Sequence, residues 1–300
     1  MPAKSEVSSQ SHRRFLIING DDFGISSGVN RAIIEAYQRG VLTSTSLMVA
    51  GKAFDEAVAL AQANPKLAVG LHLVLGRGQA VLPPEKIPHL VDSNGNFSDR
   101  VNLAGIRYHL SPGARRELPL EIRAQLEKFR STGLQLSHVD GHVDMHLNPI
   151  ALHALVELAL EFDIKVIRLP CEELRMNLNL DSRNLLTKLA WSVIMRGLHR
   201  YGKRLLKSKG ISFPERVYGW LQGGSMTEEY LLGLIPEICA DYVEIFSHPK
   251  VTLAQEQTNQ SWGMGEAELE ALLSHNVREV IVKSGFELTN YNQRVPLLMN

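Results

Sequence analysis

The chain has little cysteine, no net charge and no long hydrophobic run. Cys171 and Cys239 are the two cysteines among 300 residues, which excludes a disulfide framework and indicates a reducing compartment. The 32 basic and 32 acidic residues cancel, so nucleic-acid binding through a global basic field is excluded. Residues 1–14 are polar and no apolar run approaches the ~18 residues of a spanning helix, so we expect neither a signal peptide nor a membrane span. These features favour a cytoplasmic protein, with peripheral contact to the inner membrane face left open.

The composition is that of an ordinary globular protein, with 44% hydrophobic and 21% charged residues. A polar tail, residues 1–13, is expected to be disordered, and strand-like and helix-like segments alternate after it. This alternation predicts parallel βαβ units, and about seven of them favour an α/β fold of the irregular, distorted β/α-barrel kind over an open sheet. We find no internal repeat or low-complexity linker, so residues 14–300 are expected to form a single domain.

Hydrophobic spacing and the positions of glycine and proline predict the individual elements. The predicted strands are 15–18, 43–49, 67–75, 136–140, 165–169, 215–221 and 242–247. The predicted helices are 28–39, 54–63, 119–132, 149–162, 182–208, 227–239, 265–274 and 276–284. Residues 77–112 are expected to be irregular, and a loop of this length could be a lid, a dimer contact or a wall for substrate.

Two adjacent carboxylates, Asp21 and Asp22, directly follow the first apolar strand. Neighbouring like charges are costly unless a cation, a proton or hydrogen bonds compensate them. In β/α folds the carboxyl end of a strand is also where sites are built. A simple turn with a helix cap is the alternative, because Asp suits both positions.

Histidines are concentrated in two strand regions. His72 stands alone in an apolar strand, where a satisfied core histidine is the alternative to a ligand. Residues 138–146 contain His138, Asp140, His142 and His146, and the first three alternate onto one face if the segment is a strand. This density suits a metal site with carboxylates behind the ligands, whereas a polar surface loop is the alternative.

Two further polar residues are expected at strand ends. Pro249 cannot extend a central strand, so His248 should lie at the rim of the sheet. Arg168 ends another strand and could bind a carboxylate, orient an Asp or simply lie at the surface.

One carboxylate and two imidazoles can hold a divalent ion and leave positions open for water and substrate. Such an ion lowers the pKa of water and polarises a carbonyl, while a second carboxylate and a histidine can move the protons of amide hydrolysis. A phosphoesterase would need a second metal, for which His138, Asp140 and His146 are candidates. A non-catalytic sugar- or lipid-binding module with a closed structural metal site is a third class.

Four motifs in this order resemble those of the YdjC-like carbohydrate deacetylases, over about residues 14–291. The motifs are Asn19-Gly20-Asp21-Asp22-Phe23-Gly24, Gly70-Leu71-His72-Leu73, His138-Val139-Asp140-Gly141-His142 and Ser247-His248-Pro249. The resemblance implies a distorted β/α barrel that removes N-acetyl groups from amino sugars.

The same resemblance implies a role for each matching residue. Asp22, His72 and His142 would hold one divalent metal ion, for which Zn is expected and Mg, Ni, Co or Mn are alternatives. Asp21 would be the general base, and analogy with polysaccharide deacetylases makes His248 the candidate general acid. From the residues themselves rather than from the resemblance, we expect His138, Asp140, His146 and Arg168 to lie behind the ligands or bind substrate.

A narrower resemblance is to the hopanoid-biosynthesis-associated branch of the family. It is carried by Ser111-Pro112, Arg115-Arg116, Glu121-Ile122-Arg123-Ala124-Gln125, Arg168-Leu169-Pro170 and Ser225-Met226-Thr227-Glu228-Glu229. It implies an N-acetylglucosaminyl hopanoid as the substrate, with a soluble chito-oligosaccharide as the alternative. Asp144 departs from the pattern, because the wider family often has another histidine there.

The segment from Arg183 to Lys209 contains eight Lys or Arg and no acidic residue. Its apolar residues fall at helical spacing along one stripe, formed by Leu186, Leu189, Ala190, Val193, Gly197, Tyr201 and Leu205. A basic amphipathic helix can rest on an anionic membrane, which would suit a glycolipid substrate. The alternative is a barrel helix that packs this stripe on the core. A homodimer is also expected, on general grounds.

Overall fold

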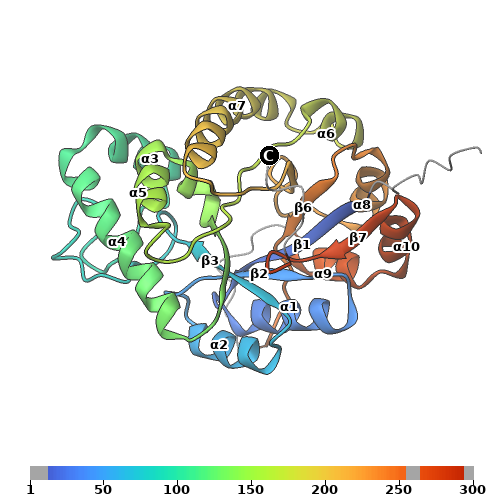
Figure 1. Ribbon diagram of the computed structural model, residues 1–300, viewed down its shortest axis with the longest axis horizontal. Helices are drawn as coiled ribbons and strands as arrows, with labels where there is room; N and C mark the ends of the chain where they lie inside the picture. The colour runs from blue at the N-terminus through green and yellow to red at the C-terminus, as the bar shows by residue number, and fades with distance from the viewer. Residues whose placement is uncertain (1–12, 255–263, 294–300) are drawn as a thin grey trace, which may run out of the picture.

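The computed structural model describes residues 13–254 and 264–293 and contains one parallel sheet (Figure 1). Its strands are β1 (Arg14–Phe23), β2 (Ser44–Leu47), β3 (Ala68–Leu73), β4 (Leu136–Gly141), β5 (Arg216–Tyr218), β6 (Tyr242–Ser247) and β7 (Phe286–Thr289). The strand order is β4-β3-β2-β1-β6-β5, and β7 also pairs with β1. β1 is therefore the central strand, with β6 along one edge and β2 and β7 sharing the other.

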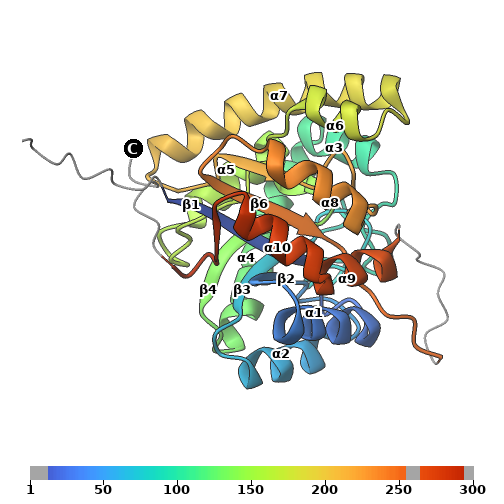
Figure 2. The same ribbon diagram turned by 90° about the vertical axis from the view of Figure 1, so that its right-hand side faces the viewer.

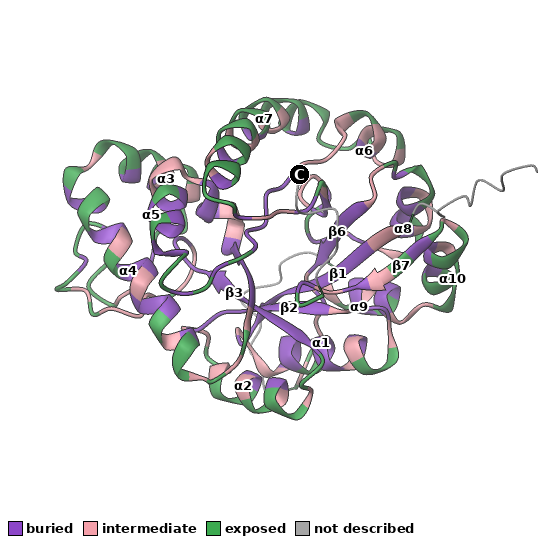
Figure 3. Ribbon diagram, viewed as in Figure 1, coloured by how far each residue is buried: buried purple, intermediate pink, exposed green. Residues whose placement is uncertain are grey.

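The sheet curls into a distorted barrel, as the sequence predicts. The predicted strand 165–169 is not a regular strand, but its segment connects the two outer strands through isolated bridges. Ile167 pairs with Val139 of β4, and Cys171 pairs with Val217 of β5. The residues of β2, β3 and β6 are all buried, as expected when a parallel sheet is covered on both faces (Figure 3).

Helices surround the sheet (Figure 2). They are α1 (Ser27–Arg39), α2 (Phe54–Ala63), α3 (Val101–Leu110), α4 (Pro112–Ser131), α5 (Pro149–Leu158), α6 (Leu174–Leu180), α7 (Leu185–Ser208), α8 (Glu228–Leu234), α9 (Gly265–Leu273) and α10 (His275–Lys283). Two short 3₁₀ helices are η1 (His142–Leu147) and η2 (Ile235–Glu237).

The structure corrects several predicted boundaries. The helix expected from residue 119 begins at Pro112, because Ser111 caps it by accepting a hydrogen bond from the Ala114 amide, and Pro119 lies inside it. Residues 77–112 are not wholly irregular, since they contain α3. Helix α6 and strand β7 are additions to the predicted elements. Of the predicted tail, residues 1–12 lie outside the described residues, and Arg13 forms an ion pair with Glu287.

Close packing at Gly70 in β3 gives a stability test. A Cβ atom there would lie 2.4 Å from the imidazole ring of buried His138. We expect Gly70→Ala to lower the free energy of unfolding by about 1–3 kcal/mol, as overpacking does.

The matched control is Gly197→Ala on the surface of helix α7. Among the described residues, no neighbouring atom lies within 4 Å of the point where a Cβ added to Gly197 would stand. Because alanine favours a helix more than glycine does, this change should be neutral or stabilising by up to about 1 kcal/mol. Urea unfolding measures both variants, and equal effects would contradict the packing at Gly70.

Candidate metal centre and cleft

A cleft of about 1360 Å³ opens at the carboxyl ends of the strands. Asp21, Asp22, His72, His142 and His248 all line it, so the structure brings together the five residues predicted to bind metal or move protons. His248 follows the end of β6, at the rim that Pro249 predicts.

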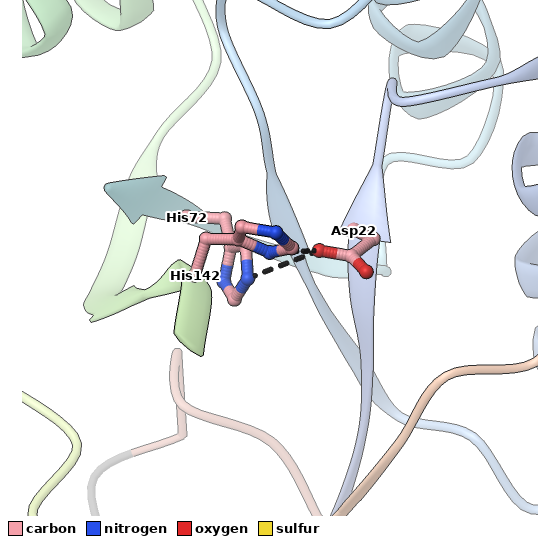
Figure 4. A group of neighbouring side chains, drawn as sticks. All are labelled: Asp22, His72 and His142. Atoms are coloured by element: carbon pink, nitrogen blue, oxygen red, sulfur yellow. Dashed lines mark hydrogen bonds and ion pairs between the residues drawn. The ribbon is translucent and has the colours of Figure 1, made fainter. Parts of the chain in front are cut away.

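Three of these side chains converge on a single point (Figure 4). Asp22 Oδ1 lies 3.2 Å from His72 Nε2 and 2.8 Å from His142 Nδ1. One ligand atom from each residue lies within 4.8 Å of the others, and all three side chains are buried. Asp22 comes from β1, His72 from β3 and His142 from the first position after β4. The barrel thus assembles the group from three separate strand ends.

Local backbone geometry lets both adjacent aspartates reach the cleft. Consecutive side chains of a regular strand point to opposite faces. The pairing of β1 with β2 shifts register between Gly20 and Phe23, and Asp22 adopts a left-handed φ of 67°. An irregularity of this kind re-aims side chains. Asp tolerates the left-handed region better than most residues, which explains its place here.

The residues after His142 also have unusual backbone angles. Val143 and Asp144 have φ values of 49° and 56°, and both line the cleft. A β-branched residue rarely adopts a positive φ, and such conformations cost of order 1–3 kcal/mol and cluster at functional sites.

A layer of charged side chains supports the three converging residues. Asp140 Oδ1 lies 2.8 Å from His72 Nδ1. Because a carboxylate can only accept a hydrogen bond, Nδ1 carries a proton, and Nε2 is the ring nitrogen that His72 presents toward Asp22. A carboxylate behind a ligating histidine is the usual arrangement at metal sites.

Arg168 contacts both Asp140 of this layer and Asp21 of the cleft. Its Nη1 donates to Asp21 Oδ2 at 2.7 Å and its Nη2 donates to Asp21 Oδ1 at 2.8 Å. Nη2 also lies 2.8 Å from Asp140 Oδ2, and Nε donates to Glu244 Oε1 at 2.8 Å. The guanidinium, only 1% exposed, lies 4.5 Å from the ring centre of Phe246. Of the alternatives for Arg168, the structure places it as the partner of buried carboxylates.

Burial and charge act in opposite directions on these groups. Burial disfavours the charged forms, but His142 and His72 hold the pKa of Asp22 well below its usual range. Burial likewise opposes a charged His72, but Asp140 and Asp22 hold its pKa well above the usual value. Asp140, Asp21 and Glu244 similarly outweigh burial and raise the pKa of Arg168. The neighbouring carboxylates therefore favour the protonated, positively charged forms of His72 and Arg168.

Four predicted residues lie outside the cleft lining, namely Asp140 and Arg168, described above, and His138 and His146. His138 stacks on Tyr291 with 3.9 Å between ring centres, and its Nδ1 lies 2.8 Å from the Ser137 hydroxyl. His146 Nε2 donates to the Arg168 carbonyl at 3.0 Å, and burial lowers the pKa of His146 to about 4. Both are fully buried, so they support the site from behind.

Sequence reasoning missed Glu244, Tyr291 and Asn19. Glu244 accepts hydrogen bonds from Arg168 and from the Tyr291 hydroxyl, and Asn19 donates to Asp21 Oδ1 at 2.8 Å. A charged residue in the middle of the apolar strand β6 is a signal that could have found Glu244. No comparable signal marks Tyr291, which follows β7.

The donor set fits one divalent ion. A carboxylate oxygen and two imidazole nitrogens are the ligands of open zinc-type sites, and Asp140 orients one of the imidazoles. A second candidate group, Asp21, His72 and Asp140, shares His72, and Arg168 already supplies its cation. The second set considered for a phosphoesterase, which included His138 and His146, is not assembled among the described residues.

Comparison with known proteins agrees with this geometry. The sequence profile described as YdjC-like protein matches residues 15–283. The chain belongs to the YdjC-like family. This YdjC-like chain is 25% identical over 280 residues to a protein named carbohydrate deacetylase from Thermoanaerobacter pseudethanolicus, covering 93% of this chain and 98% of that protein.

Two other relatives extend the comparison. A carbohydrate deacetylase from Brevibacillus brevis is 42% identical over 151 residues, which are 50% of this YdjC-like chain and 58% of that protein, a little over half its length. A solved structure from Enterococcus faecalis V583, named as a candidate cellobiose-phosphate cleavage protein, has a TM-score of 0.74 at 27% identity. That match covers 93% of this chain and 98% of the other.

The buried Arg168 provides a test of the site's electrostatics. Arg168→Met would leave Asp21, Asp140 and Glu244 without their shared cation, so we expect the free energy of unfolding to fall by about 3–5 kcal/mol. Arg216→Met is the control, because Arg216 and its partner Glu173 are both more than a third exposed and should contribute less than about 1 kcal/mol. Denaturant unfolding measures both, and a small loss for Arg168→Met would contradict its role.

Proposed function

We propose that this protein is a metal-dependent deacetylase that hydrolyses the N-acetyl group of an N-acetylglucosamine-containing substrate. The observation that carries the proposal is the convergence of Asp22, His72 and His142 beside Asp21, which Arg168 holds in the same cleft. The relatives named carbohydrate deacetylase support the reaction type.

Each residue of the centre has a role in this proposal. Asp22, His72 and His142 would hold one divalent ion, for which Zn is the first candidate from its preference for nitrogen and carboxylate ligands. When bound, the ion would lower the pKa of a water molecule and polarise the amide carbonyl. Asp140 fixes the tautomer of His72 through Nδ1.

Asp21 suits the role of general base. Its Oδ1 accepts hydrogen bonds from Asn19 and Arg168, which fix the orientation of the carboxylate. Its Oδ2 accepts a hydrogen bond from Arg168, and a carboxylate oxygen has two acceptor positions, so the second can take a proton from water. Adjacent Asp22 is engaged by two imidazoles instead, so the two aspartates divide their tasks.

His248 is the proposed general acid for the leaving amine. It lines the cleft at the end of β6 and is only partly buried, so it can reach a substrate held over the centre. Its backbone amide donates to Glu268, which fixes the start of the loop, and its ring packs edge-on against Phe246 with 5.8 Å between ring centres.

The walls of the cleft bear on the substrate. The aromatic residues Trp191 and Trp220 line it with ring centres 6.4 Å apart, and the apolar side chains Leu103, Ile106 and Ile194 line it nearer to solvent. An apolar approach beside a polar centre suits an amino sugar attached to an apolar group. We therefore favour an N-acetylglucosaminyl hopanoid over a soluble chito-oligosaccharide, with the enzyme in the cytoplasm at the inner face of the membrane.

Substitution of the adjacent aspartates should separate their roles. Asp21→Asn should retain the metal and lose turnover by about 100-fold or more, the usual scale for a general base. Asp22→Asn should lose both metal and turnover. Asp163→Asn is the control, because Asp163 is exposed and lies outside the cleft lining. Elemental analysis and acetate release measure the two properties, and an active Asp21→Asn protein would show that the base is another residue.

A comparison of acetate release from a lipid substrate and a soluble substrate should identify which one the enzyme deacetylates. We expect metal-loaded protein to release acetate faster from N-acetylglucosaminyl bacteriohopanetetrol than from a chito-oligosaccharide, because the lipid occupies the apolar walls. The Asp21→Asn protein gives the background. Faster release from the oligosaccharide would keep the reaction and reject the lipid substrate, and release from neither would reject the deacetylase.

A further inference from the structure

Helix α7 turns its apolar stripe away from the barrel. The buried residues of α7 are Lys188, Met195, Gly202 and Leu206, and a Cβ atom at Gly202 would lie 2.6 Å from Leu169. Leu186 and Val193, which belong to the stripe, are 81% and 73% exposed. Leu205 at the end of the stripe is partly buried against the core, but the other members are exposed. The interpretation that the whole stripe packs on the core is therefore wrong.

Helix α3 presents a second apolar row at the same cleft. Leu103, Ile106 and Leu110 are spaced by three and four residues, so they share one face, and each is more than half exposed. All three line the cleft, as does Ile194 of α7, which is 51% exposed. Both helices border the cleft.

We call the exposed apolar residues of these two helices, which both border the cleft, the mouth patch. It consists of Leu103, Ile106, Leu110, Leu186, Leu189, Val193 and Ile194. Of the 13 exposed large hydrophobic side chains in the described part of the chain, nine lie on α3 or α7. Isolated exposed apolar residues are ordinary, but a concentration at a cleft marks an interaction site.

The charged residues of the two helices that carry the mouth patch are all basic, which favours an anionic partner. Neither α3 nor α7 contains an Asp or Glu. The solvent side of α7 continues from its apolar half into a basic half with Arg196, Arg200 and Arg204, all exposed. An apolar surface next to clustered Arg and Lys is the combination that binds the interface of an anionic bilayer.

We propose that the mouth patch docks on an anionic membrane surface, with its apolar residues in the lipid interface and the basic half of α7 on the headgroups. No helix among the described residues is long and apolar enough to cross a membrane, so the contact would be peripheral. The inference rests on the proposed function in one respect. Docking would be useful to a deacetylase because it would turn the cleft toward a substrate carried on a membrane lipid. A second copy of the chain fits less well, since pairing two such faces would oppose basic α7 helices and cover both clefts.

Sedimentation with vesicles tests the docking without any substrate. We expect the full chain to bind vesicles of phosphatidylethanolamine and phosphatidylglycerol, and to bind phosphatidylcholine vesicles weakly. The double variant Leu186→Asp/Val193→Asp should lose about tenfold or more in affinity, because two charges would enter the interface. Val282→Asp is the matched control, since Val282 is 69% exposed on α10 and should bind as the natural chain does. Arg200→Glu should weaken binding and reduce its dependence on salt.

The outcomes separate docking from catalysis. Leu186 and Val193 do not line the cleft, so the double variant should release acetate from a soluble substrate at the natural rate. No vesicle binding by an active natural chain, or equal losses in the double variant and the control, would overturn the docking. A dimer in light scattering that the double variant makes monomeric, without vesicle binding, would assign the patch to a second copy and also overturn it. Vesicle binding by a protein that deacetylates nothing would reject the proposed function alone.

Discussion

The buried guanidinium of Arg168 is the interaction on which the rest of the site depends. Three buried carboxylates, those of Asp21, Asp140 and Glu244, contact this one cation, whereas the buried carboxylate of Asp22 does not. Buried carboxylates require compensation, so Arg168 makes the strand-end cluster compatible with folding. It also leaves Asp22 without a permanent cation, and two imidazoles face that carboxylate instead. The same distribution of charge that stabilises the barrel thus prepares a place for a divalent ion.

The geometry of the barrel brings these charged residues together at one site. Parallel strands deliver their carboxyl ends to one rim, so residues 50 to 120 positions apart in the chain meet there. The irregularity in β1 and the left-handed backbone of Asp22 bring two adjacent carboxylates to the same cleft. One is held by Arg168 and the other by histidines, so their environments differ although they are neighbours in sequence. Division of tasks between two carboxylates by environment is a general route to acid–base and metal chemistry.

The sequence predicts much of this arrangement and fails where tertiary contacts decide. Strand periodicity and order give the parallel barrel, and the resemblance to the YdjC-like family implies the set Asp22, His72 and His142, which the structure brings together. The predicted start of α4 is seven residues late, because Pro119 and Pro112 both resemble helix starts and the Ser111 cap decides between them.

Two further differences have the same origin in tertiary structure. The short strand β7 carries too little periodicity to stand out, and it positions Tyr291, whose contact with Glu244 depends on folding. Which face of α7 is buried depends on the close approach of Gly202 to Leu169, so hydrophobic spacing alone indicates the wrong face.

Anomalous diffraction from crystals grown with zinc tests the central claim most directly, because it locates the ion without assuming an activity. The account predicts one anomalous peak bonded to Asp22, His72 Nε2 and His142, with Asp140 still on His72 Nδ1 and Arg168 still on Asp21. A peak between Asp21 and Asp140 with Arg168 displaced, or no peak at these residues, would contradict it.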